Sequence, residues 1–335
     1  MSVGTVFKIL LGILAALTLI PVGTGGLNHS QSNPITTYDS AVTRFEAISA
    51  VEAPITGEPG RSVLLTHGKK TGQVVVLMHG MTNVPRQFVP LGTELFDCGY
   101  NVYIPRLPLH GLKSLDVSVL KKLRPQMYRA YADSAIDLAR GLGDTISVVG
   151  LSAGGSAAAW VAEHRRDVYR AVVIAPAITL ERIPPVLRGP AINLLTRIPN
   201  MTFHQPPDTA RFVYRGVSTK GVAQTLRFGK AVYQEADRNK PQVPRIVMVT
   251  NENDHTIDSH VARQLANRWR YKGAMVDEFK FDKKLGLQHD VIDTMEVNAN
   301  PKIVYPVVIN LLEGTVPTIV GDSAVLPPPR CSGSQ

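Results

Sequence analysis

The feature that most constrains this chain is an apolar run that ends in a glycine-flanked serine. Residues 146–155 read Ile-Ser-Val-Val-Gly-Leu-Ser-Ala-Gly-Gly, so a buried strand leads directly into Gly-x-Ser-x-Gly. This order is typical of a sharp strand-to-helix turn that exposes the serine hydroxyl at the edge of a sheet. Gly150 and Gly154 leave room for the turn, because a Cβ at either position would collide with the neighbouring strand or helix. We therefore predict that Ser152 is a nucleophile, rather than a serine in a plain turn.

The residues that follow Ser152 predict a helix from Ala153 to about His164. Small residues at its start permit close packing on the sheet. The first N–H groups of a helix carry partial positive charge, which favours an oxyanion beside the serine. We therefore expect the Ala153 N–H to be one oxyanion donor.

Short apolar strands alternate with helical segments along most of the chain. The strands are predicted at 61–67, 73–78, 100–105, 146–150, 171–175, 245–250 and 276–281, and the other helices at 85–97, 125–141, 260–271 and 303–313. This alternation predicts an α/β fold with a mostly parallel central sheet, flanking helices and right-handed crossovers. With 335 residues, 44% of them hydrophobic, the chain is long enough for one large core and an insertion.

Residues 180–242 break this alternation, because prolines interrupt their helical segments. They fall between two predicted strands, and apolar residues such as Leu187 and Ile192 favour an inserted helical lid over the nucleophile. The alternative is a long irregular surface connection. The core is then expected to comprise 43–179 and 243–314.

The first 26 residues are predicted to be a targeting segment. Lys8 precedes an apolar stretch from Ile9 to Ile20, and Pro21 with a glycine-rich stretch ends it. A cleaved signal peptide and an uncleaved N-terminal membrane anchor both fit this pattern, and a buried helix is the third alternative. The first two place the protein outside the cytoplasm, secreted, periplasmic or membrane-anchored. Residues 27–42 are predicted as a linker and 315–335 as a C-terminal tail.

The net charge of +9 is spread along the chain without basic runs or aromatic–basic interleaving. The sequence therefore argues against nucleic acid as a partner and indicates a basic surface. Two cysteines, Cys98 and Cys331, are too few for a zinc site or a disulfide framework. A bridge between them stays open but has no support in the sequence. We expect no metal and no cofactor, and the sequence leaves the oligomeric state undetermined.

A serine nucleophile needs a carboxylate that orients its base. The strand at 245–250 leads into the loop 251–257, where we predict Asp254 as this acid. Glu252 and Asp258 are the rivals, and such a cluster also forms ordinary turns.

The base is expected later in the chain, after the last strand. His289, in the loop 287–291, is our candidate, and its alternative role is that of a capping or surface histidine. His255 and His260 lie too close to the acid loop, and His164 lies at the far end of the nucleophile helix.

A second oxyanion donor is expected where the strand at 73–78 ends in His79-Gly-Met-Thr82. Gly80 permits close approach to the serine, and the turn can aim the Met81 N–H at the same point as the Ala153 N–H. We expect His79 to be structural. The alternative is an ordinary strand-to-helix turn.

These motifs together resemble the α/β-hydrolase superfamily, in the group of carboxylesterases, monoacylglycerol lipases and lysophospholipases. The matching pieces lie between about residues 60 and 314 and comprise 79–82, 105–111, 150–154, 253–257 and 289–290. The order Ser152, Asp254, His289 is the order that this superfamily uses. One departure is Leu109-His110-Gly111, where the family has Gly-His-Gly, and this leaves His110 with a structural role.

The resemblance implies a serine hydrolase that cleaves carboxylic esters through an acyl-enzyme, without a cofactor. An apolar lid favours a lipid-like or short-chain acyl group, and a basic surface favours anionic membranes. A peptidase or thioesterase with the same triad stays open, as does a binding protein that keeps the fold without activity. Epoxide hydrolase and dehalogenase chemistry is disfavoured, because those enzymes use an aspartate where this chain has Ser152.

Overall fold

A seven-stranded sheet forms the centre of the computed structural model, which describes residues 2–206, 208–320 and 323–325. The strand order is β1-β3-β2-β4-β5-β8-β9, and every pair is parallel except β1 with β3. The bounds are β1 Val63–Leu65, β2 Thr71–Met78, β3 Asn101–Ile104, β4 Gly143–Leu151, β5 Val168–Ile174, β8 Arg245–Asn251 and β9 Val276–Phe281. The predicted α/β fold with a mostly parallel sheet is confirmed.

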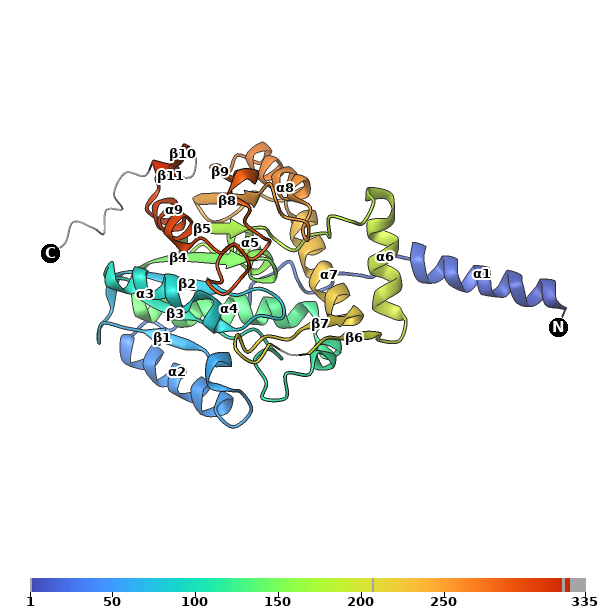
Figure 1. Ribbon diagram of the computed structural model, residues 1–335, viewed down its shortest axis with the longest axis horizontal. Helices are drawn as coiled ribbons and strands as arrows, with labels where there is room; N and C mark the ends of the chain where they lie inside the picture. The colour runs from blue at the N-terminus through green and yellow to red at the C-terminus, as the bar shows by residue number, and fades with distance from the viewer. Residues whose placement is uncertain (1, 207, 321–322, 326–335) are drawn as a thin grey trace.

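Helices cover both faces of this sheet (Figure 1). Successive residues of β2 point to opposite faces, since Val74 and Val76 belong to one buried cluster and Val75 and Leu77 to the other. The first cluster includes residues of α2 (Tyr38–Glu52), α4 (Pro125–Leu142), α5 (Ala153–His164) and α8 (Ser259–Tyr271). The second includes residues of α3 (Val89–Asp97), which continues the 3-10 turn η2 (Pro85–Phe88), and of α9 (Pro301–Glu313). Three further 3-10 turns are η1 (Glu58–Gly60), η3 (Val117–Lys122) and η4 (Lys283–Leu285).

The insertion predicted at 180–242 has two parts of different character. The helix α6 (Pro185–Arg197) and an antiparallel hairpin of β6 (Thr202–His204) and β7 (Gly216–Ser218) stand at the periphery of the body (Figure 1). The helix α7 (Thr219–Glu235) instead packs into the core, where Phe228 and Val232 are buried. A Cβ at Gly229 would lie 2.1 Å from the Ala177 carbonyl oxygen, so α7 lies directly against the chain that leaves β5. The insertion thus includes a helix that belongs to the core, and strands that the sequence did not predict.

The N-terminal helix α1 (Val3–Leu19) projects from the body and lies against α6 (Figure 1). Asn193 of α6 donates from Nδ2 to the Thr18 carbonyl oxygen and accepts from the Val22 N–H, which satisfies backbone groups where α1 ends. Among the described residues, no helix combines the length and the apolar composition that crossing a bilayer requires.

The predicted linker, residues 27–42, is bound to the body along much of its length. Leu27 is buried and its carbonyl oxygen accepts from Trp160 Nε1, while the N–H groups of Gln31 and Asn33 donate to Asp133 and Asp137 of α4. The helix α2 begins inside the predicted linker, at Tyr38.

The described part of the predicted C-terminal tail forms a small antiparallel hairpin of β10 (Thr318–Val320) and β11 (Ser323–Val325). Residues 321–322 and 326–335 lie outside the described residues. The same holds for Cys331, so the Cys98–Cys331 pairing that the sequence left open involves a residue that is not described.

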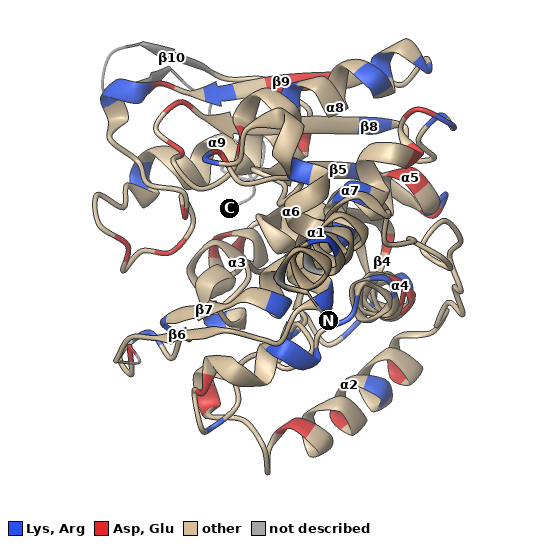
Figure 2. Ribbon diagram, turned by 90° about the vertical axis from the view of Figure 1, so that its right-hand side faces the viewer, with Lys and Arg blue, Asp and Glu red and all other residues tan. Residues whose placement is uncertain are grey.

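Lysine and arginine positions are distributed over several elements of the fold (Figure 2). In the view toward α1 they lie on α2, α4, α8 and β9, together with Asp and Glu (Figure 2). No single helix or strand in that view collects the basic residues.

Candidate active site

Ser152 occupies a strained turn between β4 and α5. Its φ of 58° and ψ of −113° lie outside the regions that L-residues normally adopt. A Cβ at Gly150 would lie 2.1 Å from the Gly154 carbonyl oxygen, and one at Gly154 would lie 2.0 Å from the Met78 carbonyl oxygen. Both glycines are therefore required by contact between backbones, as the motif predicts.

Three backbone hydrogen bonds of Ser152 hold this turn in place. The Ser152 N–H donates to the Ile174 carbonyl oxygen at 2.9 Å, which links the turn to β5. The Ser152 carbonyl oxygen accepts from the N–H groups of Ser156 and Ala177, at 2.9 and 3.0 Å. The strained conformation is thus fixed by the core, and the side chain lines a cavity of about 360 Å³.

Asp254 and His289 meet although they lie 35 positions apart in the chain. His289 Nδ1 lies 2.7 Å from Asp254 Oδ2. The other carboxylate oxygen, Oδ1, accepts from the N–H groups of Thr256 and Ile257, at 2.8 and 3.0 Å. An ionised carboxylate only accepts, so Nδ1 carries the imidazole proton and Nε2 keeps the basic lone pair. The pair therefore has the tautomer that a general base requires.

The charge state of Asp254 results from opposing effects. Burial by itself raises the pKa of this carboxyl, but the hydrogen bond and charge of His289 and the N–H groups of Ile257 and Thr256 outweigh burial. The net pKa of Asp254 lies below its ordinary value. Asp254 is thus an anion at neutral pH that can stabilise a protonated imidazole.

The two rival acids are engaged elsewhere. Glu252 bonds Lys280 and the Lys283 N–H, on the exposed side of its loop. Asp258 caps the first turn of α8 and pairs with Arg188. Of the three carboxylates, the structure therefore brings only Asp254 to His289.

Ser152 and His289 line the same two cavities, so both side chains face one space. Among the described residues, no hydrogen bond joins the Ser152 hydroxyl to the His289 ring. In unliganded enzymes this contact is commonly long and tightens only when substrate binds. The structure thus places serine and histidine around a shared cavity, with the carboxylate behind the histidine.

The turn after β2 carries the Met81 N–H, which the sequence predicts as the second oxyanion donor, and passes close to the serine. His79 Nδ1 lies 2.9 Å from the Gly80 carbonyl oxygen, and Nε2 accepts from the Leu107 N–H at 3.0 Å. The Gly80 C=O and the Met81 N–H belong to one peptide group, so His79 fixes the direction of that N–H. A Cβ at Gly80 would lie 3.6 Å from Ser152 Cβ, which shows how near this turn passes. The Ala153 N–H lies in the first turn of α5, directly after the serine.

The histidines behind this turn are neutral. Burial, and then the neighbouring His110, hold the pKa of His79 well below its ordinary value. Burial lowers the pKa of His110 to about 4, and its Nδ1 bonds the Pro108 carbonyl oxygen. The two rings pack edge to face, with centroids 5.5 Å apart. Both histidines are therefore built into the scaffold and are not positioned as bases.

The space around Ser152 has two arms of opposite character. The apolar arm, about 230 Å³, is lined by residues of the insertion and of the acid loop, among them Leu180, Val217, Val222, Leu226 and Ile257. The polar arm, about 360 Å³, is lined by polar and charged side chains that include Arg211, Arg215, His255 and Glu296. Within the described part of the chain, no group of histidine, cysteine and carboxylate side chains is arranged to hold a metal ion.

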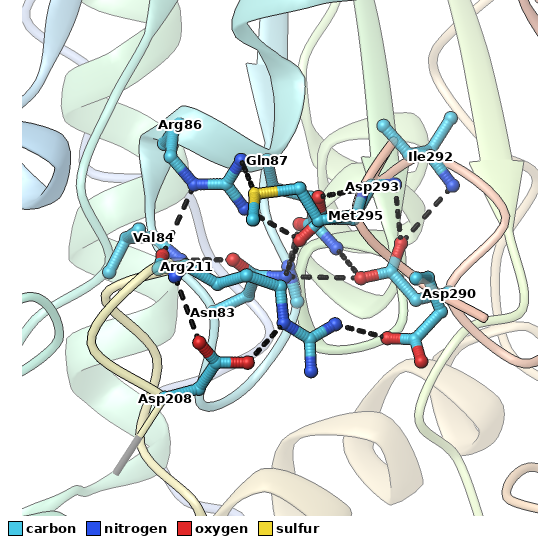
Figure 3. A network of polar contacts seen from close by, with 12 residues as sticks. Asn83, Val84, Arg86, Gln87, Asp208, Arg211, Asp290, Ile292, Asp293 and Met295 are labelled. Carbon is cyan, nitrogen blue, oxygen red and sulfur yellow. Dashed lines mark hydrogen bonds and ion pairs between the residues drawn. The ribbon is translucent and has the colours of Figure 1, made fainter. Parts of the chain in front are cut away.

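Sequence reasoning missed a buried polar network beside His289 (Figure 3). Gln87 and Asn83 donate to the carboxylate of Asp290, and Arg86 pairs with Asp293. Burial raises the pKa of Asp290, while hydrogen bonds from the Asp293 N–H and from Gln87 oppose that shift. The sequence marks Asp290 only by its place beside His289 in the motif at 289–290, and no sequence pattern marks Gln87.

Comparison with known proteins agrees with this architecture. Residues 75–286 match the model of the alpha/beta hydrolase family. A thermostable monoacylglycerol lipase from Bacillus sp. (strain H-257) is 27% identical over 190 residues, which cover 55% of this chain and 71% of the relative.

Solved structures resemble the fold at low sequence identity. A structure from a study of the metagenome-derived lipolytic enzymes LipS and LipT superimposes with a TM-score of 0.56 at 17% identity, covering 74% of this chain and 94% of the other. A monoglyceride lipase from Saccharomyces cerevisiae gives a TM-score of 0.55 at 13% identity, covering 75% and 89%. Because the family model matches more than half of the sequence, and because the fold agrees, this chain belongs to the alpha/beta hydrolase family.

Proposed function

We propose that this protein is a serine hydrolase of carboxylic esters, working through Ser152, His289 and Asp254 and an acyl-enzyme. One observation carries the proposal most strongly. His289 Nδ1 lies 2.7 Å from Asp254 Oδ2, which leaves His289 Nε2 to act as the base. His289 and Ser152 line the same cavity. No cofactor is needed for this chemistry.

In the proposed reaction, Ser152 Oγ attacks the ester carbonyl carbon while His289 Nε2 takes the hydroxyl proton. The carbonyl oxygen becomes an anion that the N–H groups of Met81 and Ala153 stabilise. Collapse of this intermediate breaks the bond to the alcohol, which leaves with the proton from His289. Water then attacks the acyl-enzyme in the same way and releases the acid. Asp254 stays ionised throughout and stabilises the imidazolium.

The two arms of the cavity suggest which part of the substrate lies where. Among the described residues, no Asp, Glu, Lys or Arg side chain lines the apolar arm, which suits an acyl chain, whereas the polar arm suits a hydrated alcohol group. We propose a small-molecule or lipid-like ester with an apolar acyl group. The relative from Bacillus is named as a monoacylglycerol lipase, which is consistent with this class of substrate.

Covalent labelling tests the nucleophile. Purified protein is treated with a fluorophosphonate, and the intact mass is measured. We expect one adduct per chain, absent in Ser152→Ala and retained in Ser156→Ala, whose buried hydroxyl lies one turn further along the same helix. Unlabelled wild-type protein would support the alternative of a binding protein that has kept only the fold.

A matched substrate series tests the ester preference. An ester, a thioester and an amide with the same acyl group are compared by kcat/KM. We expect the ester to be cleaved at a rate sensitive to acyl length. A higher kcat/KM for the thioester or the amide would reassign the enzyme to the thioesterases or peptidases.

We also propose that the protein acts outside the cytoplasm, with residues 1–26 as a signal peptide or membrane anchor. The projecting helix α1 exposes apolar side chains that include Phe7, Ile13 and Leu14. The N-terminal mass of the protein from fractionated cells tests this. A start beyond residue 26 in an exported fraction supports cleavage, and the full chain in the membrane fraction supports an anchor. The full chain in the cytoplasm contradicts both.

A further inference from the structure

A buried glutamine joins the two loops that the proposed reaction must hold together. Gln87 is 1% exposed and lies in the turn η2. Its Oε1 accepts from the Gly80 N–H at 2.9 Å, and its Nε2 donates to Asp290 Oδ2 at 2.5 Å. Gly80 precedes the donor Met81, and Asp290 follows the base His289. One side chain thus connects the oxyanion turn to the histidine loop.

Four hydrogen bonds hold the Asp290 carboxylate in place (Figure 3). Its Oδ1 accepts from the N–H groups of Ile292 and Asp293, at 3.1 and 3.0 Å. Its Oδ2 accepts from Asn83 Nδ2 at 3.1 Å as well as from Gln87. These hydrogen bonds therefore fix the chain directly after His289, and Gln87 links this part of the chain to Gly80.

The two hydrogen-bond partners of this side chain favour an amide at position 87. One end of the side chain must accept from an N–H and the other must donate to a carboxylate, and the Gln amide offers both in its neutral form. A glutamate would place a second carboxylate against Asp290. A methionine has nearly the same shape but lacks both hydrogen bonds.

We infer that Gln87 and Asp290 are positioning residues that set the spacing between the oxyanion donor at Met81 and the base at His289. This inference depends on the proposed ester hydrolysis. Both side chains also line the polar arm of the cavity, but positioning the two loops does not require them to touch the substrate. Their expected effect is therefore on kcat, with substrate binding largely unchanged.

The test uses the full chain and four variants: Gln87→Glu, Gln87→Met, Asp290→Asn, and Gln87→Glu with Asp290→Asn. We expect each single variant to lose kcat, by about 10²-fold for Gln87→Glu, because displacement of catalytic groups by about 1 Å has effects of that size. KM should stay near the wild-type value. The double variant should regain part of the loss, because the carboxylate introduced at position 87 would accept from both the Gly80 N–H and the new amide at position 290. Asn83 would lose its acceptor at Asp290 Oδ2 but keep the one at Asp293.

A matched control separates positioning from general stability. Arg86→Met removes the pair with buried Asp293, in the same network, without touching Gly80 or Asp290. We expect its thermal midpoint to fall at least as far as that of Gln87→Met, with kcat preserved. Hydrogen exchange gives a readout independent of activity, since Gln87→Met should speed exchange at 79–82 and 287–291 together.

Three results would overturn the inference: wild-type kcat in Gln87→Met, an equal loss of kcat in Arg86→Met, or a double variant no better than the single ones. Failure of the proposed function has a different signature. In that case the wild-type protein itself neither hydrolyses esters nor reacts with a fluorophosphonate at Ser152.

Discussion

The nucleophile turn and the inserted segment face each other across one cavity, yet they are built by different means. Around Ser152, backbone touches backbone, and a Cβ at Gly154 would fall 2.0 Å from a carbonyl oxygen. In α6 of the insertion, a Cβ at Gly189 would meet nothing within 4 Å, and Val186 is 79% exposed.

The turn at Ser152 and the insertion therefore meet different structural requirements. The turn must hold a strained serine in one place, and its backbone contacts leave no room for an added Cβ. The insertion contributes side chains such as Val217 and Val222 to the apolar arm, and side chains can change without moving the sheet. We therefore expect substitutions near the turn to affect the reaction and folding, and substitutions in the insertion to affect the choice of substrate.

The largest effect is expected for Asp254→Asn. Asparagine has no negative charge to stabilise the protonated His289 ring, and it no longer fixes the tautomer of that ring. In a comparable triad this substitution lowers kcat about 10⁴-fold. The measurement is kcat on a short-chain ester. Asp258→Asn is the control, because Asp258 caps α8 and should change stability but not kcat. Comparable losses of kcat in both variants would refute the assignment.

Next in size is Gly154→Ala. The added Cβ would overlap the Met78 carbonyl group, and we expect the free energy of unfolding to fall by about 3 kcal/mol or more. Gly189→Ala tests the other side of the comparison. Alanine should stabilise α6 by about 0.5–1 kcal/mol, because space is free and alanine favours helices. Urea unfolding measures both, and similar effects in the two variants would contradict the comparison.

A smaller effect is expected when the apolar arm is narrowed. Val222→Phe should lower kcat/KM for long-chain esters about tenfold relative to an acetyl ester, because the larger ring occupies space meant for the chain. Val186→Phe, on the exposed face of α6, is the matched control and should leave the chain-length profile unchanged. An unaltered profile in Val222→Phe would place the acyl chain elsewhere.

The weakest effect concerns stability and pH. The pKa of Asp254 lies below its ordinary value of 3.8. A carboxyl with a depressed pKa stabilises the fold fully above the unfolded value, and this contribution is lost as pH falls through the folded pKa. The difference in unfolding free energy between wild type and Asp254→Asn should therefore shrink as pH falls below 3.8. A difference that grows in acid would contradict this sign.

Much of the scaffold was predictable because its signals are local. The strand at 276–281 has the bounds of β9, and the predicted helix at 125–141 differs from α4 by one residue. Residues 27–42 were harder, since a polar segment without periodicity gives no sign that Asp133 and Asp137 bind its backbone. In the insertion, the sequence indicated helical segments but gave no sign of the hairpin of β6 and β7, or that α7 belongs to the core.

By itself, the sequence determined the parallel α/β sheet, the turn at Ser152 and a short list of acids and bases. These follow from alternating apolar runs and from glycines at fixed spacing, which act over a few residues. Only the tertiary structure decided that Asp254, and not Glu252 or Asp258, meets His289, and that Gln87 joins Gly80 to Asp290. Such pairings depend on where distant loops meet at the edge of the sheet, and no local pattern encodes that distance.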